Sequence, residues 1–281
     1  VELLHKASLV HDDLIDGDAL RRGQQSFHAT FGSERAVVMG DLLVAMAHDV
    51  AERMRPVLPA GVYCQIRFHF NKAHLDLCRG ELLELVAARR ERPLARDYVD
   101  RVIEGKTASL MEQSMAMGAI MAGAPAACVD ALARYGRYMG FVFQTINDIN
   151  NLTGFDLDVK GQAMTDLALG RVGYHVLGLE MTAGMEQVGL LASEIKRVER
   201  ADDGLRLRKL VQEGRLRIWL DGVICEYADQ ARQALKALPE CGALDALDSI
   251  GREMFESWFW NPESSIDRLG GGCSEECSPT N

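Results

Sequence analysis

Apolar residues recur every three to four positions along most of the 281-residue chain, which is the spacing of one face of an α-helix. Alternating apolar and polar runs, the pattern of half-buried strands, are almost absent. Prolines and glycines such as Pro93 and Gly123-Ala124-Pro125 separate the periodic stretches and predict where helices end. The pattern predicts an all-α protein with helices, bounded to within about 2–4 residues, at 1–17, 33–54, 58–90, 96–123, 127–155, 171–199, 203–234 and 243–260.

These helices predict one helical domain over residues 1–265, followed by a flexible tail over residues 266–281. The tail is rich in Gly, Ser and Pro, a composition that does not bury a core. Cys273 and Cys277 lie in it and could form a metal or redox pair, although the composition favours a plain tail. The chain opens at Val1 in what already looks like the middle of a helix, so we expect N-terminal helices to be missing from it.

Charge and composition exclude several classes of function. The chain has 31 Lys and Arg against 41 Asp and Glu, a formal net charge of -10, whereas a nucleic-acid surface is normally basic. No apolar run reaches the ~20 residues that span a bilayer, so we expect no stable membrane insertion. The seven cysteines are scattered and odd in number, which favours reduced thiols in a cytoplasmic protein. An anionic ligand would therefore need local cations or metal ions.

A cluster of aspartates follows an apolar stretch near the start of the chain. Asp12 and Asp16 are four residues apart, so they share one helix face, and Asp13 adds a third carboxylate. Desolvated carboxylates that repel one another need a cation, and their oxygens are hard ligands suited to Mg²⁺. Arg21-Arg22 follow closely, and guanidinium groups bind phosphate through paired hydrogen bonds. The cluster predicts a Mg²⁺-diphosphate site; the alternative is a solvated, charged helix end.

A second polar stripe runs along an otherwise apolar helix. Gln144, Asn147, Asp148 and Asn151 fall at positions i, i+3, i+4 and i+7 and thus lie on one face. Facing the first cluster across a cavity, the stripe would complete a second cation site. A hydrogen-bonded network in the core is the alternative, because only Asp148 is ionic.

Together these segments resemble the trans-isoprenyl diphosphate synthase family, the polyprenyl synthetases. The stretch from Glu2 to Asp16, with Arg21-Arg22-Gly23 after it, is similar to the family's first aspartate-rich motif almost residue for residue. Further anchors follow in the family's order: Gly40-Asp41, Gly80, Lys106-Thr107, Gly140-Phe141 and Phe143-Gln144. The anchors end near residue 180, and beyond that point only helical character agrees.

The resemblance implies an isoprenoid-synthase-type helical bundle around a deep central cavity. It implies an enzyme, usually a homodimer, that uses three Mg²⁺ ions to ionise an allylic diphosphate and condenses it with isopentenyl diphosphate. The implied metal ligands come from both motifs: Asp12, Asp16, Asn147, Asp148 and Asn151, with Asp13 in support. The implied diphosphate contacts are basic: Arg21 and Lys106 for the allylic substrate, and Arg22 for isopentenyl diphosphate. Thr107 and Gln144 would line the reaction centre.

Several positions depart from the family's pattern. Asn147 and Asn151 stand where the second motif normally carries Asp, and amide oxygens add no net charge, so one Mg²⁺ site should be weakened. Arg171 keeps the positive charge of a substrate-binding lysine, whereas Gly173 lacks the hydroxyl expected two residues later. Lys160 matches a further substrate-binding lysine at a spacing one residue longer than usual. The N-terminal basic residues that normally bind isopentenyl diphosphate are not in this chain.

These departures leave two other functions open. Asn147-Asp148-Ile149 resembles the start of the metal motif of class I terpene cyclases, although Asn151 and Phe155 stand where that motif has Ser and Glu. The chain could therefore be a cyclase, or a prenyltransferase with an unusual acceptor. It could also be the regulatory subunit of a hetero-oligomeric synthase, which the intact first motif disfavours.

The residues just before the first motif predict the product length. In the family, a bulky side chain five residues before the first aspartate closes the cavity and stops elongation. Here that position is Ala7, followed by Ser8. Two small side chains predict room for a product of about C20 or longer, as in geranylgeranyl and longer-chain synthases.

Overall fold

The computed structural model describes residues 1–153, 165–197, 215–239 and 242–259. Nearly all of these residues are helical, and the all-α prediction is confirmed. In chain order the helices are α1 (Glu2–Asp16), α2 (Phe27–Phe31), α3 (Ser33–Arg53), α4 (Ala60–Ala87), α5 (Arg96–Ile103), the π-helical turn η1 (Glu104–Ala108), α6 (Ser109–Met121), α7 (Ala126–Thr153), α9 (Thr165–Leu169), α10 (Tyr174–Ala183), α11 (Met185–Arg197), α13 (Arg215–Leu235) and α14 (Gly242–Phe259).

The structure differs from the predicted elements in three places. A small antiparallel hairpin joins β1 (Leu20–Arg21) to β2 (Gln24–Gln25), and strands of two residues are too short to show alternation. The helix predicted over 171–199 is two helices, because Gly184 adopts a φ of +85° and ends α10. The five-residue helices α2 and α9 were not predicted, since one turn of helix carries no measurable periodicity.

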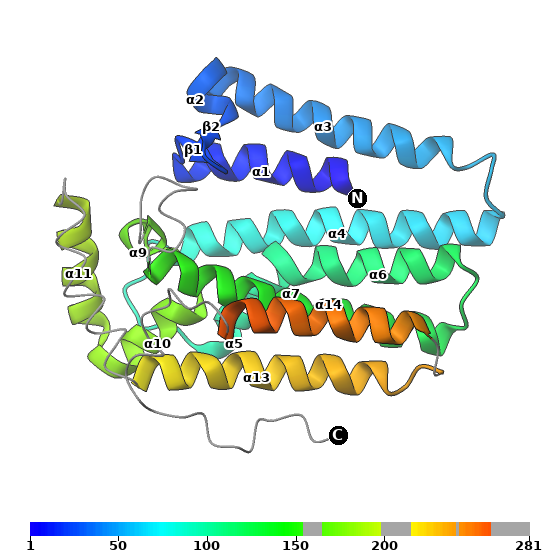
Figure 1. The fold of residues 1–281 in the computed structure, drawn as a ribbon. Coiled ribbons are helices and arrows are strands. Elements are labelled where there is room, and N and C mark those ends of the chain that lie inside the picture. The colour runs from blue at the N-terminus through cyan, green and yellow to red at the C-terminus, as the bar shows by residue number, and fades with distance from the viewer. Residues whose placement is uncertain (154–164, 198–214, 240–241, 260–281) are drawn as a thin grey trace.

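The long helices run roughly side by side along one direction of the molecule (Figure 1). α1 packs on α3, α4 packs on α6, and α7 lies against both α6 and α13. The C-terminal ends of α1, α4 and α7 point to the same end of the bundle, where the hairpin and α9 also lie (Figure 1). This end of the bundle gathers the charged residues of the site described below.

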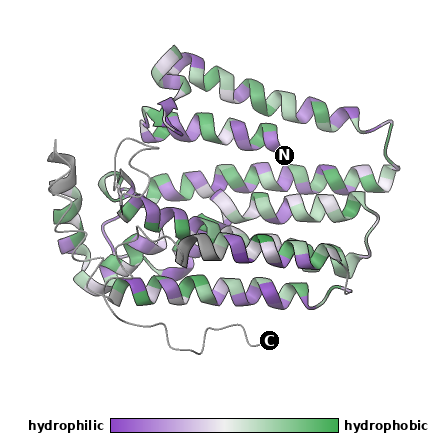
Figure 2. Cartoon of the chain, in the orientation of Figure 1, coloured by the Kyte–Doolittle hydropathy of each residue, from purple (hydrophilic) through white to green (hydrophobic). Residues whose placement is uncertain are grey.

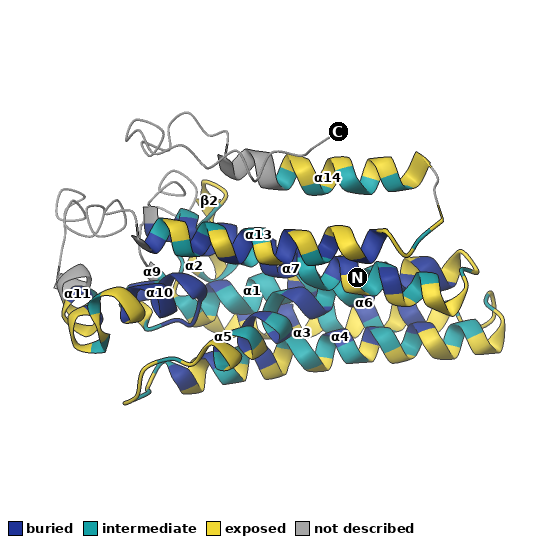
Figure 3. Cartoon of the chain, turned by 90° about the horizontal axis from the view of Figure 1, so that it is seen from below, coloured by how far each residue is buried: buried dark blue, intermediate teal, exposed yellow. Residues whose placement is uncertain are grey.

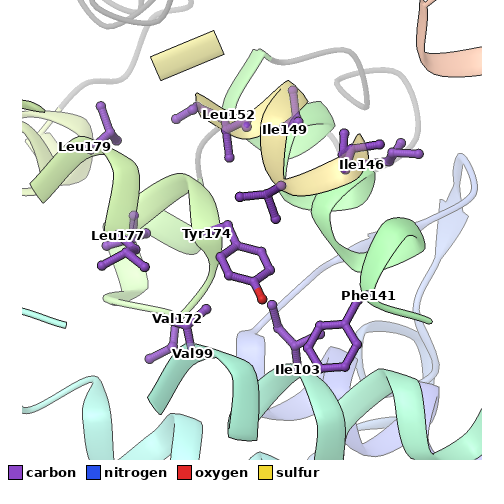
Figure 4. Close-up of a cluster of buried hydrophobic side chains, with 14 of the residues drawn as sticks. Val99, Ile103, Phe141, Ile146, Ile149, Leu152, Val172, Tyr174, Leu177 and Leu179 are labelled. Carbon is purple, nitrogen blue, oxygen red and sulfur yellow. The ribbon is translucent and has the colours of Figure 1, made fainter. Parts of the chain in front are cut away.

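Amphipathic helices explain the layering. Hydrophobic and hydrophilic residues alternate around most helices in Figure 2, as expected for helices with one face on a core. The helix α10 is an exception, because all its residues from Tyr174 to Glu180 are buried (Figure 3). The largest apolar cluster surrounds Tyr174 with side chains from α5, α7 and α10, among them Val99, Ile103 and Phe141 (Figure 4). Tyr174 thus fixes α10 against α7, the helix that carries the second polar stripe.

Several sequence-based expectations concern regions beyond this core. The tail over 266–281, with Cys273 and Cys277, lies outside the described residues. Within the described helices, none combines the length and the apolar character needed to cross a bilayer. Among the described cysteines, Cys64, Cys78 and Cys128 carry free thiols.

Candidate active site

The first aspartate cluster lies in the last two turns of α1. Gly17, with a φ of +73°, ends the helix directly after Asp16. Asp13 is buried, whereas Asp12 and Asp16 are partly buried and border a cavity. A helix C-terminus carries partial negative charge, so it repels these carboxylates and increases their need for cations.

The hairpin supplies the first cation. Its turn residues Arg22 and Gly23 both have positive φ, 52° and 73°, which is the backbone of a two-residue hairpin turn matched to the strand twist. The hairpin folds Arg21 back onto α1, where its guanidinium donates to Asp13 Oδ1 at 2.5 Å and lies 3.6 Å from Asp12 Oδ2. Arg22 is exposed and borders the cavity.

Lys106 supplies the second cation from the π-helical turn η1. Single π-turns inside helices often occur at functional sites because they redirect side chains. A Cβ on Gly80 would lie 2.3 Å from the Lys106 backbone nitrogen, so only glycine allows α4 and η1 to approach this closely. Lys106 Nζ then lies 3.1 Å from Asp12 Oδ1, 3.0 Å from Glu81 Oε2 and 2.7 Å from Glu84 Oε2.

Arg171, just after α9, supplies the third cation. Its side chain is buried and forms an ion pair with Asp16. It also lies 3.5 Å from Glu81 Oε1 and 3.6 Å from Glu84 Oε2. Glu81 and Glu84 therefore bridge Lys106 to Arg171 and complete the charged end of the cavity.

The carboxylates of this end outnumber the cations that contact them. Five carboxylates (Asp12, Asp13, Asp16, Glu81 and Glu84) face three cations (Arg21, Lys106 and Arg171). Within the described residues, no three carboxylate, imidazole or thiol groups form a closed metal cage. Hard oxygen donors with an excess of negative charge fit a Mg²⁺ ion that completes its shell with phosphate oxygens.

Lys106 and Glu84 show how burial and neighbouring charge compete in setting the pKa values of this end. Burial opposes the charge on Lys106, but the carboxylates of Asp12, Glu84 and Glu81 outweigh it and raise the Lys106 pKa well above its ordinary value. For Glu84, burial dominates over Lys106 and raises the pKa to about 7. Lys106 is thus a permanent cation, whereas Glu84 exchanges a proton near neutral pH.

The raised pKa of Glu84 predicts a pH-dependent stability. Because folded Glu84 holds its proton to about pH 7 and unfolded Glu84 releases it near 4.5, the wild-type chain loses stability as pH rises through that window. Glu84→Gln removes this titration. We expect the difference in unfolding free energy, variant minus wild type, to be about 2 kcal/mol larger at pH 7 than at pH 5. Urea unfolding of both proteins at the two pH values measures this difference. A difference that does not change with pH would contradict the raised pKa of Glu84.

The second polar stripe borders the same cavity on α7. Gln144, Asn147 and Asp148 are among the cavity-lining residues, together with Thr107. Thr107 Oγ1 donates to Gln144 Oε1 at 2.6 Å, and Gln144 Nε2 donates to Asp148 Oδ1 at 2.7 Å. Asn151 is buried, and its Oδ1 accepts the Asp166 backbone N–H at 3.4 Å. The structure thus places three of the four stripe residues opposite the first cluster, and it places Asn151 in the core.

The cavity behind the charged end has a volume of about 1080 Å³. It follows α1 from Asp16 back to Val1, and Ala7 and Ser8 both border it. Away from the charged end its walls are mainly apolar and come from five helices: Leu4, Leu77, Leu110, Met111, Met115, Met139, Phe143, Leu247, Ile250 and Met254. One end of the cavity therefore fits a charged group with its counter-ions, and the rest fits a hydrocarbon chain.

Comparison with known proteins agrees with this geometry. The family model described as Polyprenyl synthetase matches residues 1–211. The chain belongs to the polyprenyl synthetase family. It is 30% identical over 252 residues to a probable mitochondrial hexaprenyl pyrophosphate synthase of Neurospora crassa, covering 88% of this chain and 54% of that protein. It is 38% identical over 181 residues to heptaprenyl diphosphate synthase component 2 of Geobacillus stearothermophilus, covering 63% of this chain and 53% of that protein.

A solved structure of the family has the same fold. The polyprenyl synthase of Caulobacter crescentus CB15, complexed with calcium and isoprenyl diphosphate, superposes with a TM-score of 0.78 at 27% identity. The match covers 90% of this chain and 75% of that one. The chain spans about half the length of the curated relatives described above. The predicted resemblance to this family is confirmed.

Three residues that contact the predicted site residues were missed from the sequence. Glu81 directly follows Gly80 and Glu84 comes one turn later, but charged residues three apart on a helix are normally solvent-exposed. His175 lies 3.2 Å from Asp148 and is buried; no spacing connected it to the stripe. The signal that could have revealed Glu81 and Glu84 is the glycine before them, which marks a close helix contact.

Two other positions discussed from the sequence, Lys160 and Phe155, lie outside the described residues.

Proposed function

We propose that this chain is a Mg²⁺-dependent prenyltransferase. It ionises an allylic diphosphate and condenses the resulting allylic cation with isopentenyl diphosphate. The final product is a trans-polyprenyl diphosphate of about C20 or longer. The observation that carries the proposal is the excess of carboxylates, with basic partners, at one end of an apolar cavity. Family membership and the related synthases support it.

Asp12 and Asp16 would hold the metal. They lie one turn apart on α1 and border the cavity, so their oxygens are available to one cluster of ions. Bound Mg²⁺ would neutralise the negative charge that develops on the departing diphosphate. The buried Asp13 instead holds Arg21 in place.

The basic residues would bind the diphosphate oxygens. Arg21 and Lys106 already lie beside Asp12, so a phosphate bridged to that carboxylate by metal would be within their reach. Arg171 would contact it from the side of Asp16. Exposed Arg22 would hold the diphosphate of isopentenyl diphosphate.

The apolar part of the cavity would protect the reaction. An allylic cation is captured by water unless its surroundings are dry, and Met, Leu and Phe side chains line this region. Thr107 fixes the amide of Gln144 through a 2.6 Å hydrogen bond. Gln144 would thereby be oriented toward the reacting carbons, where alignment within contact distance speeds addition.

One product analysis tests the proposal. The purified chain is supplied with Mg²⁺ and farnesyl diphosphate, with and without isopentenyl diphosphate, and the products are identified by mass spectrometry. We expect a longer diphosphate only when both substrates are present. A hydrocarbon or alcohol from farnesyl diphosphate alone would contradict the proposal and indicate a cyclase. Turnover that requires a second, different chain would indicate a subunit of a hetero-oligomeric synthase, as the name of the Geobacillus relative suggests for that protein.

The length of the cavity supports a product of C20 or longer. Along α1, Ala7 lies ~7.5 Å from Asp12, and Val1 lies ~9 Å beyond Ala7, at 1.5 Å of rise per residue. Because Ala7 and Ser8 are small, nothing on this helix face closes the cavity between Asp12 and Leu4. A growing chain would therefore pass Ala7 instead of stopping there.

A bulky residue at position 7 is expected to shorten the product. Ala7→Phe places a ring in the path of the chain, and overpacking against a rigid wall costs about 1–3 kcal/mol, so elongation should stop at least one isoprene unit short of the wild-type product. Lys6→Phe, on the exposed face of the same helix, serves as the control and should keep the wild-type product. Product sizes by chromatography measure the effect, and equal lengths in all three proteins would contradict it.

We also propose that the chain forms a homodimer through α3 and α4. Large apolar side chains are exposed in rows on both helices, at the spacings of a single helix face. On α3 they are Val38, Leu42, Met46 and Val50, and on α4 they are Phe68, Leu75, Leu82 and Val86. Rows of this size on a monomer usually mark a protein interface.

Charge placed in these rows is expected to separate the subunits. Leu42→Glu introduces a carboxylate that cannot be buried at an interface without several kcal/mol of cost, so the dimer should dissociate to a monomer. Asp130→Lys, at an exposed polar position on α7, is the control. Light scattering during size-exclusion chromatography gives the mass, and a monomeric wild type would refute the homodimer.

The free thiols support a cytoplasmic location, since reducing compartments keep cysteines unpaired. One relative is named as mitochondrial, so fractionation of cells that express the tagged full-length protein is the test. Recovery in an organelle fraction would contradict the proposal.

A further inference from the structure

Asp148 is the one carboxylate of the second stripe, and each of its oxygens has a polar neighbour. Its Oδ1 accepts the Gln144 Nε2–H at 2.7 Å, and its Oδ2 lies 3.2 Å from His175 Nδ1. Asp148 borders the cavity but is only 2% exposed. The carboxylate is therefore held in place on both sides and is almost closed off from the cavity.

His175 holds Asp148 from the side away from the cavity. It lies on α10, is 1% exposed and is not among the cavity-lining residues. Asp148 is therefore held between Gln144 at the cavity and the buried His175 behind it.

Gly173 provides the space for this pair. A Cβ at position 173 would lie 2.3 Å from Asp148 Oδ2 and 2.6 Å from His175 Cε1. Any larger residue would push the two side chains apart. His175 can therefore lie beside Asp148 only because position 173 has no side chain.

The two asparagines of the stripe do not restore a metal site. Asn147 borders the cavity but is neutral, and Asn151 is buried with its Oδ1 on the Asp166 backbone. A Mg²⁺ ion is held mainly by charged oxygens. The stripe therefore offers a metal a single carboxylate that is almost fully buried, whereas the first cluster offers several beside the cavity.

We infer that the second stripe does not bind Mg²⁺ and that it instead positions Gln144 through Asp148 and His175. The relay consists of Thr107, Gln144, Asp148 and His175, in which Thr107 and Asp148 hold the two ends of the Gln144 amide. His175 is a positioning residue, because it fixes Asp148 and does not border the cavity. The inference rests on the proposed function. It restricts the metal ligands of that function to the first cluster, Asp12 and Asp16.

Counting bound ions tests the metal part of the inference. Mn²⁺ is titrated into the wild-type chain with inorganic diphosphate present, and free Mn²⁺ is measured by electron paramagnetic resonance. We expect Asp148→Asn to bind the same number of ions as the wild type, whereas Asp16→Asn binds at least one fewer. Asp130→Asn, exposed on the same helix as Asp148, is the matched control. Loss of one ion in Asp148→Asn would overturn the inference.

Steady-state kinetics tests the positioning part. His175→Leu and Gln144→Ala are each expected to lower kcat about 100-fold, as a displaced catalytic group does, with KM changed less than about twofold. Because both act through one amide, the double variant should be no slower than the single ones. His175→Asn keeps a nitrogen near the Nδ1 position and should recover part of kcat. Losses that multiply in the double variant would overturn the relay.

The outcomes separate this inference from the proposed function. A wild-type chain that binds no Mn²⁺ with diphosphate would overturn the proposed function, and the inference would fall with it. Normal binding by the wild type, combined with fewer ions in Asp148→Asn or His175→Leu, would overturn only the inference. Circular dichroism checks that each variant is folded. If His175→Leu does not fold, the double variant Asp148→Asn/His175→Leu replaces it, because this variant also removes the charge of Asp148.

Discussion

Asp16→Ala is expected to lower the rate of prenyl transfer at least ~1000-fold, which corresponds to about 4 kcal/mol of lost transition-state stabilisation. The carboxylate borders the cavity and lies one turn from Asp12, so its removal should eliminate a metal ligand. The chain should still fold, because Arg171 keeps Glu81 and Glu84 as partners. Initial rates with farnesyl and isopentenyl diphosphates at saturating Mg²⁺ measure the effect.

The control for this variant is Asp49→Ala, which removes an exposed carboxylate on α3. Its rate should stay within about twofold of the wild type, since surface ion pairs contribute little. Asp16→Ala activity within tenfold of the wild type would remove Asp16 from the metal site. The proposed mechanism would then lack half of its metal ligands.

Lys106→Met is expected to destabilise the folded chain by about 3 kcal/mol at pH 8, because breaking a buried ion pair leaves an uncompensated charge. Lys106 is the shared partner of Asp12, Glu81 and Glu84, and its side chain is 24% exposed. Without it, three carboxylates repel one another in a partly dry site. Urea unfolding of the wild type and the variant measures the loss.

The cost of Lys106→Met should be smaller at pH 6 than at pH 8. Glu84, whose pKa is about 7 even with Lys106 present, takes up a proton at the lower pH and no longer needs a cation. Lys106→Arg keeps the charge and should lose less than half as much stability as Lys106→Met at both pH values. A larger cost at pH 6, or a cost below about 1 kcal/mol at pH 8, would contradict this account of the charged end.

The sequence predicted the helices and the first cluster because both depend on local spacing. Apolar periodicity identifies a helix within its own residues, and the four-residue interval of Asp12 and Asp16 places them on one face. Arg21 was also predicted near them, although the hairpin that turns it back was not. A two-residue strand pair is defined by its turn, where Arg22 adopts a positive φ, and not by any periodic pattern.

The missed residues depend on contacts between distant segments. Glu84 meets Lys106 across 22 positions and Arg171 across 87, so no local pattern connects them. His175 meets Asp148 only because the buried helix α10 packs on α7. The sequence left two interpretations of the second stripe open, a cation site or a hydrogen-bonded network. The contacts of Asp148 favour the network.

The most direct measurement is a crystal structure of the chain with Mn²⁺ and an unreactive thio analogue of farnesyl diphosphate, recorded with anomalous scattering. The account predicts Mn²⁺ peaks on the oxygens of Asp12 and Asp16, with diphosphate oxygens on Arg21 and Lys106 and the hydrocarbon chain passing Ala7. A diphosphate bound elsewhere, or Asp12 and Asp16 without metal in the complex, would contradict the central claim that this cluster binds the metal-diphosphate of an allylic substrate.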